Sequence, residues 1–373
     1  MTHRFITLAT PGVQQLQPYL PGKPVAELER ELGIQHAIKL ASNENPLGPS
    51  PLALAALRQA LSSIHYYPDG SGFALSQRIA ERNHVDISNV TLGNGSNDIL
   101  EMLAHAYLTP ADSAVFSEHA FAVYPIVVQA VGARANIAST LSATDTTMPL
   151  GHDPDALLGC IDNTTRLIFI ANPNNPTGTW LTPPQLLGLF ERIADDIIIV
   201  LDLAYMEYMD KRLQPDIADW LQRFPNLVIT RTFSKVYALA GLRIGYALSH
   251  PDIANILNRV RQPFNTSSLA QAAALASLDD SEHLHKSVAM NNAGKVMLEA
   301  VFDAMQLDYL PTMGNFIALH VKQNGQALYQ RLLKHGIILR PVANYQMPDY
   351  LRITIGTESQ NQRLLTALAE ELG

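Results

Sequence analysis

The chain has 373 residues, of which 47% are hydrophobic and 16% are charged, and its formal net charge at pH 7 is -8. This size and apolar content predict a globular protein of two or three domains with a substantial core. The net charge argues against nucleic-acid binding, and no apolar run reaches the roughly 18 residues that a membrane helix needs. We therefore expect neither nucleic acid nor a membrane as a partner, and no metal.

The N-terminal region and the cysteine content predict where the protein works. The first eight residues lack the apolar stretch of a signal peptide, and Cys160 is the single cysteine, so no disulfide can form within the chain. We expect a cytoplasmic protein in which Cys160 is a small buried residue rather than a nucleophile. Four prolines, the last of them Pro24, predict that the chain begins as an extended arm.

A glycine-rich turn follows the first predicted strand. The strand covers residues 89–92, the turn is Gly93–Asp98, and a helix runs on from Asp98 to Tyr107. Backbone N–H groups at a helix N-terminus favour an anion such as phosphate. A tight turn with Ser96 as a helix cap is the alternative, and the turn alone favours that simpler interpretation.

Buried strands are predicted over residues 114–117, 166–171, 197–202 and 227–231. The last three are continuous apolar runs rather than alternating ones, which suits a mostly parallel sheet covered on both faces by helices. A helix is predicted between the strands at residues 166–171 and 197–202. It begins at Thr182, where proline at the first helical position and Gln185 complete a capping box. Strands and helices alternate, so the predicted fold class is α/β.

The C-terminal third predicts a smaller α+β unit. Its expected elements are a helix over 281–305, a strand over 316–321, a helix over 324–335, a strand over 351–355 and a helix over 360–372. We divide the chain into residues 1–40 (N-terminal arm and part of the small domain), 41–265 (large α/β domain) and 266–373 (small C-terminal α+β domain).

Polar residues follow the predicted strands at their carboxyl ends, where open α/β sheets bind ligands. Asp202 ends one strand, Asn175 lies in a loop after another, and residues 232–235 follow a third. A buried carboxylate needs a partner, so Asp202 forms either a structural salt bridge or a bond to a protonated ring nitrogen. Lys235 and Arg243 suit a cofactor with an aldehyde and a phosphate, although a solvated lysine is the common alternative.

With these motifs the chain resembles the fold-type I aminotransferases, which depend on pyridoxal 5'-phosphate (PLP), and among them the histidinol-phosphate aminotransferases. The resemblance runs nearly end to end. It rests on residues 18–24, 40–46, 67–70, 93–98, 172–178, 202–205, 232–245 and 351–356. Most of these segments are shared by the wide superfamily, whereas residues 18–24 and 40–46 point to the histidinol-phosphate branch.

The resemblance implies a role for each matching position. Lys235 is implied to be the Schiff-base lysine, Asp202 the partner of the pyridine nitrogen, and Tyr205 a catalytic residue that bonds the ring oxygen together with Asn175. The implied phosphate-binding residues are Ser96, Asn97, Thr232, Ser234 and Arg243, with Tyr67 reaching the phosphate from the neighbouring subunit. Phe121 is implied to stack on the ring, with Tyr124 as the alternative. The implied substrate contacts are Tyr19, Asn43, Arg340 and Arg352.

The implied reaction interconverts L-histidinol phosphate and 2-oxoglutarate with 3-(imidazol-4-yl)-2-oxopropyl phosphate and L-glutamate, a step of histidine biosynthesis. The implied assembly is a homodimer with shared active sites. An aromatic amino acid aminotransferase for phenylalanine and tyrosine, or a PLP decarboxylase or lyase of the same fold, stays open. A PLP-binding transcription regulator is disfavoured, because no basic helix-turn-helix pattern precedes the core.

Two further expectations concern the lysine. As a general base, Lys235 needs a pKa below its ordinary value, and burial and the cationic phosphate site should lower it. Val236 and Ala238 replace the family's usual small residue and glycine, so we expect them to crowd the phosphate end or shift the local turn.

Overall fold

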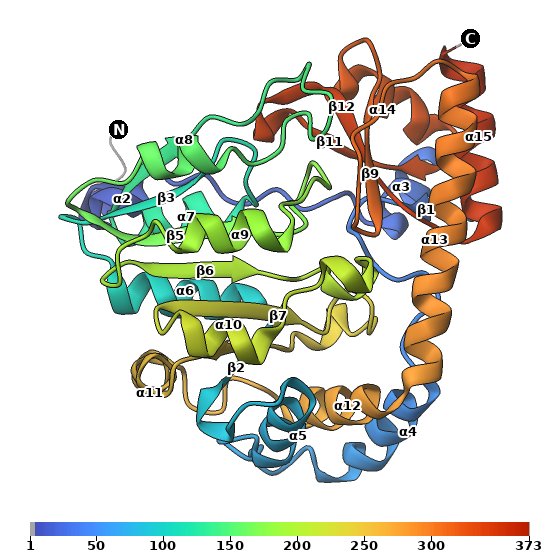
Figure 1. The fold of residues 1–373 in the computed structure, drawn as a ribbon. Helices are drawn as coiled ribbons and strands as arrows, with labels where there is room; N and C mark the ends of the chain where they lie inside the picture. Colours follow the sequence, from blue (N-terminus) through green and yellow to red (C-terminus); the bar gives the residue numbers. More distant parts are fainter. Residues whose placement is uncertain (1–3, 373) are drawn as a thin grey trace.

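A seven-stranded sheet organises the larger part of the protein in a computed structural model that describes residues 4–372 (Figure 1). The strand order is β2-β8-β7-β6-β5-β3-β4, and β8 is antiparallel to both neighbours while the other pairs are parallel. The predicted mostly parallel α/β sheet is confirmed. Its strands are β2 (Val90–Gly93), β3 (Ser113–Ser117), β4 (Arg134–Ala138), β5 (Thr165–Ala171), β6 (Ile198–Asp202), β7 (Leu227–Thr232) and β8 (Gly245–Ser249).

The strands are continuously apolar because both faces of the sheet are buried. Along β5, Ile168 and Ile170 enter one core cluster, whereas Leu167 and Phe169 enter another on the opposite face. The first face is covered by α5 (Phe73–Asn83), α8 (Pro154–Gly159), α9 (Pro183–Phe190), α10 (Ile217–Arg223) and α12 (Ser268–Asp279). The second is covered by α6 (Ser96–Tyr107), α7 (Val123–Ala130) and α11 (Pro251–Val260).

A second, smaller core lies at the far end of a long helix, α13 (Ser281–Ala304), which joins the two parts (Figure 1). Its strands are β9 (Phe316–His320), β11 (Arg340–Val342) and β12 (Met347–Thr354) in an antiparallel sheet, with β1 (Ile38–Lys39) and β10 (Ile337–Ile338) paired in parallel. Its other helices are α3 (Val25–Leu32), α14 (Gly325–Lys334) and α15 (Glu358–Leu372). The predicted C-terminal elements are thus confirmed in type and order.

The packing of α12 bears on where the two parts divide. Ala270 and Ala273 of this helix are buried in the large core, and α12 also packs against α4 (Pro51–Ala60). The predicted boundary after residue 265 would assign α12 to the small domain. We therefore propose that the division falls within α13 instead.

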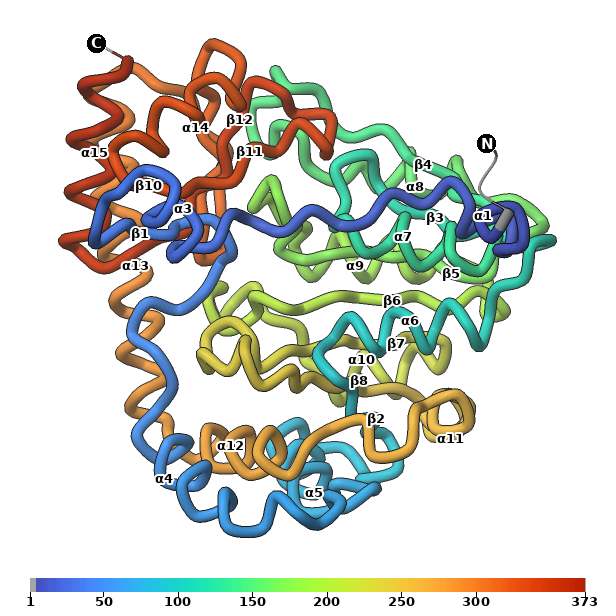
Figure 2. The backbone as a smooth tube through the Cα atoms, turned by 180° about the vertical axis from the view of Figure 1, so that it is seen from behind, coloured from blue at the N-terminus to red at the C-terminus, as the bar shows by residue number. Residues whose placement is uncertain are grey.

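The N-terminal segment is only partly the extended arm that the prolines predict. Two short helices, α1 (Arg4–Leu8) and α2 (Pro11–Gln14), precede residues 16–24, which have no regular secondary structure and cross the back of the molecule toward α3 (Figure 2). The prediction is wrong for α2 because Pro11 stands in its first turn, where a missing N–H costs no helical hydrogen bond.

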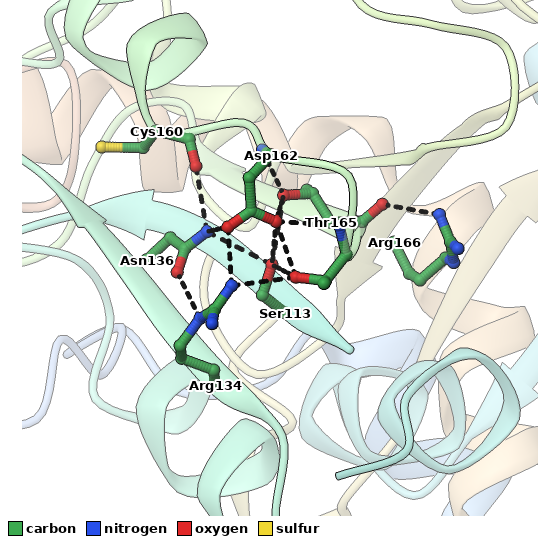
Figure 3. A network of polar contacts seen from close by, with 8 residues as sticks. Ser113, Arg134, Asn136, Cys160, Asp162, Thr165 and Arg166 are labelled. Carbon is green, nitrogen blue, oxygen red and sulfur yellow. Dashed lines mark hydrogen bonds and ion pairs between the residues drawn. The ribbon is translucent and has the colours of Figure 1, made fainter. Parts of the chain in front are cut away.

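A polar network ties together the amino ends of β3, β4 and β5, at the opposite edge from the carboxyl ends (Figure 3). The Asp162 carboxylate accepts from Arg134 Nη2 at 2.6 Å, from Asn136 Nδ2 at 3.1 Å and from the Thr164 backbone N–H at 2.9 Å. Cys160 lies beside this network and is half-buried, so the expectation of a buried cysteine is wrong. Its carbonyl, not its thiol, joins the network by accepting from Asn136 Nδ2 at 3.0 Å.

Short 3-10 helices complete the described elements. They are η1 (Leu61–Ser63), η2 (Ile87–Asn89), η3 (Met206–Tyr208), η4 (Lys211–Leu213), η5 (Ala240–Leu242) and η6 (Ala343–Tyr345). None of the helices within residues 4–372 combines the length and apolar character required to cross a bilayer.

Candidate active site

A cavity of about 230 Å³ lies at the carboxyl ends of β5, β6 and β7, beside the amino end of α6. Ten of the predicted cofactor-binding or catalytic residues line it: Ser96, Asn97, Phe121, Asn175, Asp202, Tyr205, Thr232, Ser234, Lys235 and Arg243. They come from segments far apart in the chain, and the parallel strands bring them together because their carboxyl ends share one edge of the sheet.

One end of the cavity suits an anion. Gly95 caps α6 with φ 82, a left-handed conformation that exposes the first N–H groups of the helix. A Cβ at Gly95 would overlap Arg243 Nη2, and a Cβ at Gly245 would stand 2.6 Å from the Ser96 nitrogen. Glycine at both positions therefore leaves the room that the guanidinium and the helix end need. The predicted cap, Ser96, is instead the first residue of the helix.

Asp202, the last residue of β6, also lines the cavity. Its carboxylate is buried, with Oδ1 accepting from the Ala204 N–H at 3.2 Å and Oδ2 accepting from the Tyr124 hydroxyl at 3.1 Å. Burial raises the pKa of Asp202 above its ordinary value, and the hydrogen bond from Tyr124 opposes that rise. Such a carboxylate is suited to a cationic N–H partner, which would favour its charged form.

Lys235 also lines the cavity, and its Nζ donates to the Ser42 carbonyl at 3.3 Å. Burial, followed by the positive charges of Arg352 and Arg243, lowers the pKa of Lys235 to about 8. The prediction of a depressed lysine pKa is confirmed. Burial contributes more than the cationic phosphate site, because losing the hydration of an ammonium disfavours its charged form.

The Tyr205 hydroxyl accepts a hydrogen bond from Asn43, which was predicted to contact substrate. Asn43 Nδ2 donates to Tyr205 Oη at 2.9 Å, while the Asn43 side-chain carbonyl accepts from Thr354 Oγ1 at 3.2 Å. Burial raises the pKa of Tyr205 to about 12, so this phenol keeps its proton and can donate it to a ligand. Asn43 also lines the adjoining cavity, and its substrate contact stays a prediction.

That adjoining cavity, of about 140 Å³, shares Ser42, Phe121, Asn175 and Lys235 with the first. Its walls also bring together the four predicted substrate contacts: Tyr19, Asn43, Arg340 and Arg352. The Arg340 guanidinium lies 5.5 Å from the centre of the Tyr19 ring, and its Nη1 donates to the Leu20 carbonyl at 2.9 Å. The extended N-terminal segment thus forms part of this wall.

Arg352 is buried, and only some of its guanidinium nitrogens form hydrogen bonds with the described residues. Its Nη1 donates to Asn175 Oδ1 at 2.5 Å and its Nη2 donates to the Ala41 carbonyl at 2.6 Å, whereas its buried Nε has no hydrogen-bond partner within residues 4–372. A buried guanidinium without a carboxylate partner is costly. This charge fits an anionic group of a ligand in the adjoining cavity.

Tyr67 is the one predicted site residue that this single chain does not bring to either cavity. It is 82% exposed, and its ring stacks on Phe264 at 4.7 Å between centroids. Within its own chain Tyr67 is therefore not part of the lining of either cavity. The predicted contact with a neighbouring subunit stays a prediction.

Val236 and Ala238 do not crowd the phosphate end as predicted, because neither lines the cavity. Val236 is buried in the large core, and its carbonyl accepts from Asn45 Nδ2 at 2.8 Å. Ala238 takes a left-handed conformation with φ 56, a backbone region that favours glycine. The local cost is therefore backbone strain at residue 238 rather than a steric clash with a ligand.

Three cavity residues with polar side chains were not predicted: Ser42, Glu44 and Tyr345. Ser42 and Glu44 belong to residues 40–46, which the resemblance singled out without assigning them a role. The Glu44 carboxylate lies 3.0 Å from Lys39 Nζ. Tyr345, in η6, carries no local sequence signal, because only tertiary packing brings it beside Arg352.

These residues fit PLP. The helix end and Arg243 suit a phosphate, the buried carboxylate of Asp202 suits a pyridinium nitrogen, and the amine of Lys235 suits an aldehyde. Phe121, rather than the fully buried Tyr124, lines the cavity where a ring would stack.

Comparison with known proteins gives concordant matches. Residues 35–368 match the family model of aminotransferase class I and II. The chain is 54% identical to histidinol-phosphate aminotransferase 2 of Pseudomonas fluorescens, over 100% of this chain and 99% of that protein. It is 53% identical to the protein of the same name in Pseudomonas aeruginosa, over 99% and 98% of the two chains. The crystal structure of histidinol-phosphate aminotransferase from Sinorhizobium meliloti in complex with PLP is 28% identical, with a TM-score of 0.89 over 97% of each chain.

Proposed function

The chain belongs to the aminotransferase class I and II family, and on that premise we propose that it transfers the amino group of L-histidinol phosphate to 2-oxoglutarate. The products are 3-(imidazol-4-yl)-2-oxopropyl phosphate and L-glutamate, and the reaction is a step of histidine biosynthesis. One observation carries the proposal. Lys235 faces both cavities, with Asp202 and the anion site on one side and Arg340 and Arg352 on the other.

The first cavity would hold PLP through Ser96, Asn97, Thr232, Ser234 and Arg243 at its phosphate, Asp202 at its nitrogen, and Asn175 and Tyr205 at its ring oxygen. When bound, PLP supplies an aldehyde carbon that takes up an amine and a ring that withdraws electrons from it. Asp202 would secure the ring's positive charge, since a buried carboxylate and a cationic N–H each favour the charged form of the other.

Lys235 Nζ is the group that moves the proton. With a pKa of about 8, roughly a tenth of this amine is unprotonated at pH 7, far more than at the ordinary lysine pKa of 10.5, so it can accept a proton from the substrate carbon and return it elsewhere. The Tyr205 phenol holds its own proton and does not compete as a base, because burial raises its pKa to about 12.

Arg340 and Arg352 would bind the anionic group of the substrate. Guanidinium groups suit both the phosphate of histidinol phosphate and the carboxylates of glutamate, so one pair can serve both half-reactions. The Arg352 Nε, for which the described residues 4–372 offer no hydrogen-bond partner, provides a donor for such a group.

Absorbance of the holoprotein tests the proposal. We expect L-histidinol phosphate to convert the cofactor absorbance from the aldehyde form to the amine form, and 2-oxoglutarate to reverse the change. L-histidinol, which lacks only the phosphate, is the matched control and should react far more slowly. Lys235→Ala should lower the rate by about a thousandfold.

Three results would contradict the assignment. An unchanged spectrum would exclude this transamination. Because L-histidinol phosphate has no carboxylate to lose, a decarboxylase would be indicated instead by release of CO2 from a phosphorylated amino acid. Faster conversion by phenylalanine or tyrosine than by histidinol phosphate would favour the aromatic aminotransferase.

We further propose a cytoplasmic homodimer with shared active sites. Phe264, which stacks on Tyr67, is exposed, and so are four apolar side chains close to Tyr67 in the sequence: Leu61, Ile64, Tyr66 and Phe73. A dimer interface here would cover these side chains, and exposed apolar patches are typical of interfaces. The single cysteine supports a reducing compartment, since the chain needs no internal disulfide.

A further inference from the structure

Tyr124 has a hydroxyl group that its packing does not require. The residue is fully buried near the start of α7, its ring stacked on Phe169 at 4.8 Å between centroids and edge-on to Phe121 at 5.8 Å. A phenylalanine would make the same ring contacts. Burying an extra hydroxyl without a partner would be costly, so the partner of this group is informative.

That partner is the carboxylate of Asp202. Tyr124 Oη donates to Asp202 Oδ2 at 3.1 Å, while the Ala204 N–H donates to Oδ1 at 3.2 Å. Burial, followed by the charge of Asp202, raises the pKa of Tyr124 well above its ordinary range. The phenol therefore keeps its proton and acts as a fixed donor, which approaches the carboxylate from outside the cavity.

We propose that Tyr124 is a positioning residue that orients Asp202 and keeps its carboxylate charged, so that the shared proton resides on the PLP ring nitrogen. A hydrogen bond to the charged form of a carboxylate stabilises that form and makes it a weaker base. Without the phenol, the carboxylate in this dry site would compete more strongly for the proton of the ring nitrogen. The inference rests on the proposed function, because it requires PLP in the cavity.

The contrasting interpretation is that Tyr124 only fills space between Phe169 and Phe121. The two interpretations differ in what the loss of one oxygen atom does. If the residue only packs, removing the hydroxyl alters stability and leaves the protonation of the cofactor unchanged. If it positions Asp202, the proton moves from the ring nitrogen toward the carboxylate.

The test compares Tyr124→Phe with wild type, both reconstituted with PLP whose ring nitrogen is isotopically labelled for NMR. We expect the nitrogen resonance to move toward its unprotonated position in the variant. Turnover should fall about tenfold, the effect of losing one hydrogen bond to a charged group. Tyr246→Phe is the control, since Tyr246 is also buried but lies on β8 with its hydroxyl near Asn83. It should leave the resonance in place.

A second variant checks that Tyr124 acts through Asp202. In an Asp202→Asn background, Tyr124→Phe should cause no further loss of turnover and no further change in the nitrogen resonance. An undiminished effect in that background, or an unmoved resonance in the single variant, would overturn the inference. An assay of the wild-type holoprotein distinguishes failure of this inference from failure of the proposed function. If wild type itself does not convert histidinol phosphate, the proposed function fails, whatever the variants do.

Discussion

Single residues in this protein derive their chemical properties from burial. Lys235 and Asp202 have pKa values displaced in opposite senses, and in both cases the largest cause is the loss of hydration. The neighbouring charges modify the outcome without reversing it. Chemistry at this site therefore depends on how tightly the surrounding elements exclude water, as well as on which groups are present.

Removing the charge of Lys235 should stabilise the protein without cofactor. Because the folded state lowers the lysine pKa from 10.5 to about 8, the unfolded state binds more protons between these values, and the charge costs stability below pH 8. Lys235→Met should therefore raise the melting temperature at pH 7. The gain should shrink as the pH rises from 8 to 10.5, and an equal gain at both ends of that range would contradict the lowered pKa.

Gly95→Ala should weaken PLP binding about tenfold, as expected when a contact to a charged group is lost. The added Cβ would overlap Arg243 Nη2, and φ 82 is a strained conformation for alanine. Gly159→Ala is the matched control, because its Cβ would meet no atom within 4 Å. Equilibrium titration with PLP measures the affinity of both variants for the cofactor. Unchanged affinity of Gly95→Ala would show that Arg243 does not bind the phosphate.

At the scale of elements, α13 both joins the two cores and completes the smaller one. Leu298 and Phe302 on this helix are fully buried in the small core, whereas Leu284 and Val288, nearer its start, pack against the large one. The helix thereby fixes Arg340 and Arg352, which the smaller unit carries, relative to Lys235.

Phe302→Ala should destabilise the protein by about 3–5 kcal/mol, because it leaves a cavity in a core that cannot collapse fully. Val296→Ala on the same helix is the control. Its side chain is 64% exposed, so the change should stay within about 0.5 kcal/mol. Urea unfolding followed by circular dichroism compares them. Equal midpoints for the two variants would mean that the small core is not a tightly packed unit.

At the scale of the whole molecule, the isolated chain leaves Tyr67 outside the lining of both cavities. Its exposure and the surrounding apolar side chains are explained if a second copy covers this surface. Tyr67 would then complete the partner's phosphate site. A monomer would lack that contact and should be poorly active.

Mixing Tyr67→Phe and Lys235→Ala subunits tests this arrangement. If Tyr67 crosses to the partner, the mixed dimer contains one site with both residues intact, and activity should exceed that of either homodimer. If the tyrosine served its own subunit, no site in the mixed dimer would be intact. Activity no higher than that of the homodimers, with dimers verified by size-exclusion chromatography, would therefore contradict a shared site.

Much of the fold could be predicted because its signals are local. The continuous apolar runs at residues 166–171, 197–202 and 227–231 each became a buried strand, since strands covered on both faces need no polar side. The arm was predicted less well, because proline breaks a helix only in its interior and Pro11 stands at a helix start.

The sequence by itself determined the α/β class, the order of the elements and the polar residues at the strand ends. Periodicity, glycine conformation and capping act over a few residues, so they can be read along the chain. Only the tertiary structure decided that Phe121 lines the cavity while Tyr124 binds Asp202, that Asn43 donates to Tyr205, and that Arg352 reaches Asn175. These contacts join residues distant in sequence, and their partners depend on how separately formed elements pack, which no local pattern encodes.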